Sequence, residues 1–304
     1  MIYLMFVVGI CGLFFGGEFL VRGAIGIAHR LSVPPLVIGL TVVGFGTSMP
    51  ELLVSLQAAL AGAPALAIGN AVGSNIANIL LILGLTALIL PPPIAIADTR
   101  RDFAVMFGAT LVLWALLLGG TIRHWQGAVL VAGLVLYVYV SIRSGKSATD
   151  AELPAVAVNL GRNVLLALGG LIVLMIGARL LVESATGIAR TFGVSEAVIG
   201  LSIVAIGTSL PELATSALAA LRGHSDIAVG NILGSCIFNI LGIIGMTAIV
   251  APIPVDPRFA QVDMWIAGAA ALAMLGFALL PGRVSRWGGS GLLAGYASYL
   301  LLLA

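Results

Sequence analysis

Charged residues are scarce in this chain of 304 residues, where Asp, Glu, Lys and Arg together make up 9%. Soluble domains carry roughly 25% of these residues, so a soluble fold is excluded. The net charge of +2 is too small, and the charges are too dispersed, to indicate binding to nucleic acid. With 61% hydrophobic residues, the chain is predicted to form one domain inside a lipid bilayer.

Cysteine and histidine are also rare, with two and three residues. Cys11 and Cys236 fall in apolar stretches, so neither a structural disulfide nor a cysteine metal cluster is expected. The ligands that zinc and copper prefer are missing from the apolar segments, because all histidines are expected at loops: His29, His124 and His224. No nucleophile or metal-protease motif accompanies the buried acids, so neither an enzyme nor a cofactor is predicted.

Long apolar runs are abundant instead. About 20 apolar residues cross the ~30 Å hydrocarbon core as a helix. Division at polar, glycine and proline positions predicts ten spans: 2–28, 35–60, 66–90, 103–120, 125–142, 161–189, 196–221, 227–250, 262–281 and 287–304. The first span lacks a positive leading region and a clear cleavage site, so we expect it to be retained. The predicted fold class is an all-α integral membrane protein of about ten transmembrane helices.

Basic residues are distributed unequally between the two sides of this topology. Alternate threading places nine of them on one side: Arg30, Arg100, Arg101, Arg143, Lys146, Arg162, Arg222, Arg283 and Arg286. The other side receives Arg123, Arg190 and Arg258. The first side is therefore predicted to be cytoplasmic, which puts both termini outside a multi-pass protein of the cell membrane. The polar linker 144–160 lies inside.

The two halves repeat each other without a gap at an offset of 161 residues. GFGTSMPELLVS at 44–55 aligns with AIGTSLPELATS at 205–216, and the stretch 67–84 aligns with 228–245. Five spans per half is an odd number, so the second copy must enter the membrane from the opposite side. We therefore predict two inverted five-helix repeats, 1–143 and 161–304. Such repeats are the usual construction of secondary transporters, although duplication without this function remains the alternative.

Each half carries one carboxylate deep within an apolar span, Glu51 and Glu212. An ionised acid is costly there, so a functional role is the default interpretation. Each glutamate follows a proline, Pro50 or Pro211, whose ring removes one helical hydrogen bond and disturbs the carbonyl four residues earlier. Freed carbonyls at this depth must be satisfied by protein, water or an ion. The pattern predicts a cation site beside two helix breaks.

Further oxygen-bearing residues share helical faces by their spacing of four: Thr47 with Glu51, Thr208 with Glu212, Ser74 with Asn78, and Ser235 with Asn239. Calcium takes six to eight oxygen ligands, and two carboxylates balance its charge. Alternatively, the hydroxyl and amide side chains only pack helices and hydrogen-bond between them.

Two ion pairs are also predicted from a spacing of four residues, Glu18 with Arg22 and Arg179 with Glu183. Their order of charge is reversed between the halves. A structural role at the membrane edge is favoured over a role in gating or ion entry, because a satisfied pair lowers the cost of burial.

The stretches GTSMPE (46–51), GTSLPE (207–212), GNAVGSNIAN (69–78) and GNILGSCIFN (230–239) resemble the paired alpha repeats of the sodium/calcium exchanger branch of the calcium:cation antiporter superfamily. The chain lacks a large cytoplasmic loop and in this respect resembles the prokaryotic members. The resemblance implies exchange of Ca²⁺ for Na⁺ by alternating access. It also implies that the glutamates bind Ca²⁺, with help from the threonines and the Gly44 and Ala205 carbonyls, and that serines and amides form Na⁺ sites. The candidate ligands are Glu51, Glu212, Thr47, Thr208, Gly44, Ala205, Ser48, Ser209, Ser74, Ser235, Asn78 and Asn239.

One position departs from this pattern, because Asn239 stands where some exchangers carry aspartate. Sodium is the expected counter-ion, and a Ca²⁺/H⁺ antiporter or a cation channel remain alternatives. We predict that Asn78 and Asn239 tune the counter-ion more than Ca²⁺, because an amide offers one oxygen and no charge. The glycine-rich first and sixth spans are expected to slide during transport, and a monomer is expected to suffice.

Overall fold

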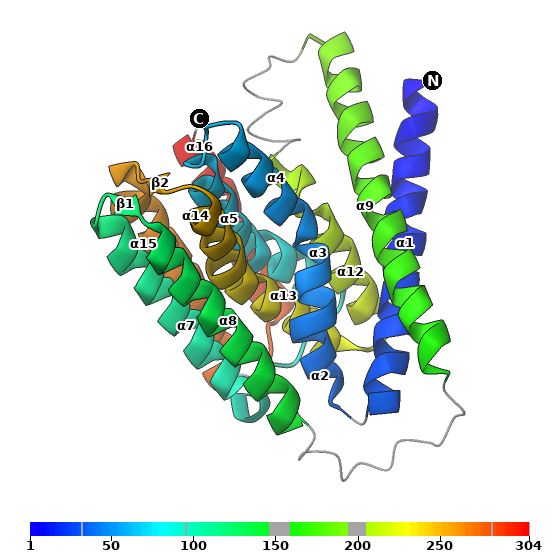
Figure 1. Ribbon diagram of the computed structural model, residues 1–304. Coiled ribbons are helices and arrows are strands. Elements are labelled where there is room, and N and C mark those ends of the chain that lie inside the picture. The colour runs from blue at the N-terminus through cyan, green and yellow to red at the C-terminus, as the bar shows by residue number, and fades with distance from the viewer. Residues whose placement is uncertain (32, 95, 146–158, 194–204, 281, 304) are drawn as a thin grey trace.

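The computed structural model describes residues 1–31, 33–94, 96–145, 159–193, 205–280 and 282–303, which form a bundle of helices with one pair of short strands (Figure 1). Over these ranges, seven helices are each long and apolar enough to cross a bilayer. The pair Pro35–Thr47 and Met49–Leu60, bent by 41°, adds an eighth span. The all-helical membrane fold is confirmed, whereas the count of ten spans is not. Residues 196–204 of the predicted seventh span, and most of the linker 144–160, lie outside the described residues.

The two halves contain equivalent elements. The first half consists of α1 (Ile2–Leu31), α2 (Pro35–Ile38), the π-helical turn η1 (Gly39–Val43), α3 (Gly44–Thr47), α4 (Met49–Leu60), α5 (Leu66–Ala77), the π-helical turn η2 (Asn78–Leu83), α6 (Gly84–Ile89), α7 (Ile96–Leu118), β1 (Thr121–Ile122) and α8 (His124–Gly145). The described second half consists of α9 (Leu160–Thr191), α11 (Ala205–Gly207), α12 (Leu210–Leu221), α13 (Ser225–Phe238), η5 (Asn239–Ile244), α14 (Gly245–Val250), β2 (Ile253–Pro254), η6 (Phe259–Asp263), α15 (Met264–Leu279) and α16 (Arg286–Leu303). Three pairs of elements begin and end at positions that differ by 161: α4 and α12, η2 and η5, and α6 and α14.

One predicted boundary was clearly wrong. The predicted span 103–120 starts too late, because α7 begins at Ile96 and includes Arg100 and Arg101. Its first turns accommodate these charges, since Arg101 pairs with the neighbouring Asp102 at 3.2 Å and Asp98 suits the positive end of the helix dipole.

The histidines were predicted at loops, and one of the three lies there. His29 belongs to the last turn of α1, and His124 is the first residue of α8. His224 precedes α13 outside a helix, as predicted. A basic side chain in the last turn of α1 suits the negative end of the helix dipole. Cys11 and Cys236 are free thiols, as predicted.

The equivalent helices α1 and α9 pack along their length and run antiparallel (Figure 1). Glycines make this close approach possible: a Cβ on Gly16 would lie 2.5 Å from the Leu174 nitrogen, and one on Gly23 would lie 2.5 Å from the Ala167 nitrogen. The order of these contacts, with later residues of α1 meeting earlier residues of α9, shows that the two copies are inverted. Both chain ends lie at the same end of the bundle (Figure 1).

Filling this glycine seam is expected to destabilise the fold. Gly16→Ala introduces a Cβ against the backbone of α9, so α1 must move away, at a cost of about 1–3 kcal/mol. Gly108→Ala on α7 is the matched control, because no atom lies within 4 Å of its Cβ position. Thermal unfolding of the purified proteins in detergent should show a lower Tm for the first variant and an unchanged or higher Tm for the second. Equal Tm values would contradict the tight seam.

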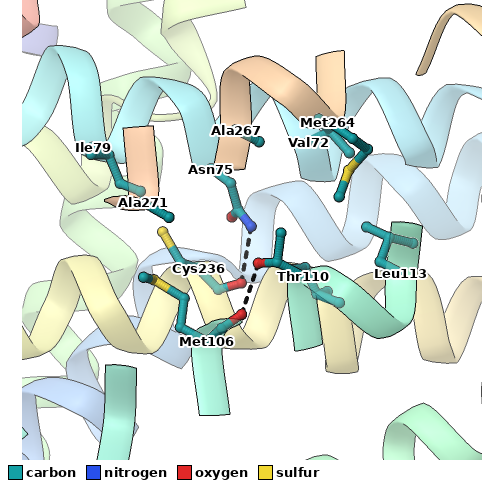
Figure 2. Close-up of a pocket in the computed structure, with 11 residues that line it drawn as sticks. Val72, Asn75, Ile79, Met106, Thr110, Leu113, Cys236, Met264, Ala267 and Ala271 are labelled. Carbon is teal, nitrogen blue, oxygen red and sulfur yellow. Dashed lines mark hydrogen bonds between the residues drawn. The ribbon is translucent and has the colours of Figure 1, made fainter. Parts of the chain in front are cut away.

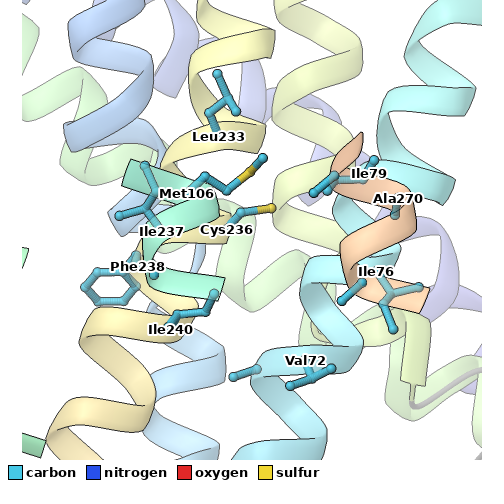
Figure 3. Close-up of a cluster of buried hydrophobic side chains, with 14 of the residues drawn as sticks. Val72, Ile76, Ile79, Met106, Leu233, Cys236, Ile237, Phe238, Ile240 and Ala270 are labelled. Carbon is cyan, nitrogen blue, oxygen red and sulfur yellow. The ribbon is translucent and has the colours of Figure 1, made fainter. Parts of the chain in front are cut away.

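The centre of the bundle is built from α5 and α13. All residues of α13 except Asp226 are buried, so this helix is surrounded by protein instead of lipid. Apolar side chains from α5, α7, α13 and α15 form the core around it, among them Val72, Met106, Ile237 and Ala270 (Figure 3). The ligand candidates on α5 and α13 therefore sit on the best-packed helices of the fold.

Candidate cation site

Both predicted helix breaks are present, and each places a glutamate in the first turn after it. Between α3 and α4, Ser48 leaves the helical conformation at φ −85° and ψ 7°, and Ser209 does so before α12 at φ −89° and ψ 5°. Pro50 and Pro211 are tolerated because each stands at the start of the new helix, where no hydrogen bond is lost. The π-helical turn η1 was not predicted. It begins at Gly39, where a Cβ would lie 2.8 Å from the Ile227 carbonyl oxygen of α13.

The Glu51 carboxylate is fully buried, and neither of its oxygens has a hydrogen-bond partner among the described residues. Glu212 is 1% exposed, and its Oε1 accepts a hydrogen bond of 2.8 Å from the Ser48 hydroxyl, while Oε2 has no described partner. A hydrogen bond thus joins Ser48, at the helix break of the first half, to the Glu212 carboxylate of the second half. A buried carboxylate without donors is stable only with a positive charge beside it or a proton upon it.

Other buried oxygens in the same set are also unpartnered within the described part of the chain. They are the side-chain oxygens of Asn78, Asn239 and Ser209. A neutral oxygen buried without a donor costs free energy that a coordinated cation would recover. Together with the free glutamate oxygens, these atoms are the candidates for direct contact with an ion.

Among the remaining predicted residues, those at the first helix break and on α13 take part in hydrogen bonds within the protein. The Thr47 hydroxyl lies 3.1 Å from Asn231 Oδ1 and 3.3 Å from the Gly44 carbonyl oxygen. That carbonyl also accepts a hydrogen bond of 3.0 Å from the Ser235 hydroxyl, so it is engaged rather than free. Ser74 is buried in α5. Ala205 begins α11, and Thr208 is partly exposed.

Two asparagines that sequence reasoning missed support the glutamate backbones. Asn70 Nδ2 donates to the Glu51 carbonyl and to Ser55 Oγ, both at 2.9 Å. At the offset of 161, Asn231 Nδ2 donates to the Glu212 carbonyl at 3.3 Å and to Ser216 Oγ at 2.9 Å. The signal was present, because the aligned stretches GNAVG and GNILG carry asparagine at the same place in both halves.

The two predicted ion pairs form, but they are not equivalent. Glu18 accepts a hydrogen bond of 2.6 Å from Arg22, is 4% exposed, and is also 2.8 Å from Arg222 at the end of α12. Arg179 and Glu183 are 2.7 Å apart, and both side chains are largely exposed. The contact with Arg222 was not predicted. It has no counterpart in the other half, where the equivalent residue is Ala61.

Access to the candidate site differs between the two sides. A cavity of about 580 Å³ opens between α4, α9 and α12 and is lined by Gln57, Arg179 and Thr208. At the equivalent place in the other half, Thr47 is fully buried. There α1 lies directly on α12, since a Cβ on Gly17 would lie 2.6 Å from a Leu218 methyl carbon. The cavity therefore reaches Thr208 without being lined by either glutamate, whereas the equivalent Thr47 is enclosed by protein.

Comparison with known proteins agrees with this geometry. The sequence matches the family described as sodium/calcium exchanger protein over residues 1–143 and 162–304. CaxA of Alkalimonas amylolytica is 41% identical over 97% of this chain and 96% of its own length. The sodium/calcium exchanger MaX1 of Methanosarcina acetivorans is 29% identical over 99% and 98% of the two chains. A solved structure of the sodium-calcium exchanger NCX_Mj has a TM-score of 0.85 at 32% identity and covers 100% of this chain and 98% of that one.

The chain belongs to the sodium/calcium exchanger family. It is a membrane transporter of the Ca²⁺/cation antiporter class, and the predicted exchanger fold is confirmed.

Proposed function

We propose that this chain exchanges Ca²⁺ for Na⁺ across the cell membrane by alternating access. The observation that carries the proposal is the Glu51 carboxylate, which is fully buried, has no described hydrogen-bond donor, and is mirrored by Glu212 at the equivalent break. Two carboxylates neutralise one Ca²⁺, and the same pair can be neutralised by monovalent ions that arrive in its place. Binding either cargo in turn is what exchange requires.

The ligand set of the proposal is the one predicted from the sequence. Glu51 and Glu212 bind Ca²⁺ directly, supported by oxygens of Thr47, Thr208 and the carbonyls of Gly44 and Ala205. Na⁺ is bound by side-chain oxygens from the serines and amides of the set: Ser48, Ser209, Ser74, Ser235, Asn78 and Asn239. Ser48 uses its hydrogen in the bond to Glu212, so the lone pairs of its oxygen stay available to an ion.

Alternating access uses the asymmetry of the site. The cavity beside α9 is the open pathway in this conformation, and the packing of α1 against α12 is the closed gate. When α1 and α9 slide together across the remaining helices, the pathway beside α9 closes and the gate between α1 and α12 opens. In this topology the linker 144–160 is cytoplasmic, both termini are extracellular, residues 1–143 and 161–304 are the two inverted repeats, and one monomer transports.

A comparison of ion gradients in proteoliposomes tests the proposal. Vesicles loaded with Na⁺ and diluted into Na⁺-free buffer with Ca²⁺ should accumulate Ca²⁺, and protein-free vesicles should not. A proton gradient or a K⁺ gradient of equal size should give only background uptake. Uptake driven by protons alone would replace Na⁺ with H⁺ as counter-ion. Ca²⁺ current that needs no opposing gradient would indicate a channel and refute exchange.

A further inference from the structure

The side chain of Asn75 lies between the two halves and contacts Asn239 of the candidate ligand set. Its Nδ2 donates a hydrogen bond of 3.1 Å to the backbone carbonyl of Cys236, and its Oδ1 accepts one of 3.0 Å from Asn239 Nδ2 (Figure 2 shows the first). Asn75 is 7% exposed and Asn239 is fully buried, so water does not compete freely for either bond. Asn75 therefore links α5 to Cys236 on α13 and to Asn239 at the start of η5.

We propose that Asn75 is a positioning residue that fixes the side-chain amide of Asn239 so that its oxygen, and not its NH₂ group, is offered to the counter-ion. The inference deepens the proposed Ca²⁺/Na⁺ exchange and rests on it. Asn239 Oδ1 is one of the buried oxygens without a described partner, which is the condition expected of an atom reserved for a cation.

The hydrogen bonds from Asn239 to Asn75 and from Asn75 to the Cys236 carbonyl form a relay, and its direction follows from donor and acceptor chemistry. A backbone carbonyl can only accept, so the atom of Asn75 that faces Cys236 must be the NH₂ group. The atom that faces Asn239 is then the Asn75 oxygen, and Asn239 must donate to it. A rotated Asn239 would place two oxygens against each other and direct its NH₂ group, which carries partial positive charge, at the ion. The relay excludes that rotamer.

The relay is weaker on the other side of the pseudo-symmetry. At the offset of 161, the residue equivalent to Asn75 is Cys236, whose thiol is a weak donor and acceptor. Asn78, the equivalent of Asn239, contacts this thiol without a hydrogen bond of good geometry for either amide atom. The Asn239 amide is therefore held by a full hydrogen bond, whereas the Asn78 amide faces a thiol that can donate or accept only weakly. We expect the two amides to contribute unequally to the binding of the counter-ion.

The space around Asn75 explains why its removal should free Asn239. Asn75, Thr110, Met106 and Cys236 line a small cavity of about 10 Å³, which has room for about one water molecule (Figure 2). Truncation of Asn75 enlarges this cavity beside Asn239. A water that enters can donate to or accept from the Asn239 amide, so both rotamers become satisfied and the preference is lost.

Na⁺ and Ca²⁺ dependence of exchange in proteoliposomes tests the relay. Asn75→Ala should raise the Na⁺ concentration for half-maximal exchange by about fivefold to tenfold, the effect of one net hydrogen bond between neutral groups. The half-maximal Ca²⁺ concentration should change less than twofold. Asn75→Leu fills the space but cannot accept a hydrogen bond from Asn239, so it should shift the Na⁺ dependence as much as Asn75→Ala does. It replaces the alanine variant in the test if that variant does not fold. Thr110→Val is the matched control, because it lines the same cavity and its hydroxyl hydrogen-bonds the Met106 carbonyl on its own helix.

A double variant separates positioning from general packing. If Asn75 acts through Asn239, then Asn75→Ala should cause no further shift in Na⁺ dependence when added to Asn239→Ala. Additive shifts, an equal loss for Na⁺ and Ca²⁺, or unchanged Na⁺ dependence in folded Asn75 variants would each overturn the relay while wild-type exchange stands. A wild type without Na⁺ dependence would instead refute the proposed function, and the relay with it.

Discussion

Glu51→Gln and Glu212→Gln should each reduce Ca²⁺ transport to background. Glutamine keeps the size of the side chain but removes one negative charge and one ligand oxygen from a buried site whose proposed ligands include only these two acids. Breaking a buried charge pairing of this kind costs about 3–5 kcal/mol. Ca²⁺ binding should therefore weaken by at least about 100-fold. Calorimetry of the purified variants and ⁴⁵Ca²⁺ uptake by proteoliposomes measure binding and transport separately.

The control for these variants is Asp256→Asn, which neutralises an exposed carboxylate outside the candidate site. Its uptake and Ca²⁺ affinity should match those of the wild type. The effect of Glu51→Gln should be at least as large as that of Glu212→Gln, because Ser48 still has an oxygen to donate to in the second variant. Uptake close to wild type in either glutamine variant would remove that residue from the ligand set.

A covalent link between α1 and the end of α12 should stop exchange. Glu18 and Arg222 contact each other across these helices, so cysteines at both positions can be joined by a short bifunctional thiol reagent. Cys11→Ala and Cys236→Ala remove the two native thiols first. Because the proposed motion carries α1 past α12, the linked protein should lose nearly all Na⁺-driven Ca²⁺ uptake. Cleavage of a reducible linker should restore the uptake of the unlinked double-cysteine variant.

The matched link joins α1 to α9 instead. Leu13 and Ala178 belong to one buried apolar cluster, and cysteines there tie together two helices that are proposed to slide as a pair. Exchange should persist after this link forms. Full activity with α1 linked to α12, or loss of activity with α1 linked only to α9, would be inconsistent with the proposed sliding motion.

Much of the site was predictable because the repeat carries its information twice. A single proline before a single glutamate predicts little, but Pro50–Glu51 and Pro211–Glu212 at the offset of 161 predicted two breaks, and both are present. Such a break depends on local backbone geometry, which nearby residues largely determine. The glycine-rich first and sixth spans, predicted to slide, pack closely on each other, and their sliding stays a prediction.

The features that were missed depend on which helices meet. Arg222 follows α12 in the sequence, and nothing in its neighbourhood indicates that it reaches Glu18 on α1. Asn75 gave no signal by comparison of the halves, because its equivalent is a cysteine. Asn70 and Asn231 were visible as a matched pair, but a backbone carbonyl as their target could not be inferred without the packing of α5 on α4 and of α13 on α12.

The seam between α1 and α9 also bears on how the protein is assembled. Each half-chain, made separately, would present to lipid a backbone groove that only the other half can fill. Coexpressed fragments divided within 144–160 would therefore have to meet in the membrane, each oriented opposite to the other, before either became complete. The linker keeps the second half near the first from the moment of synthesis, which replaces a bimolecular encounter with a local search at high effective concentration.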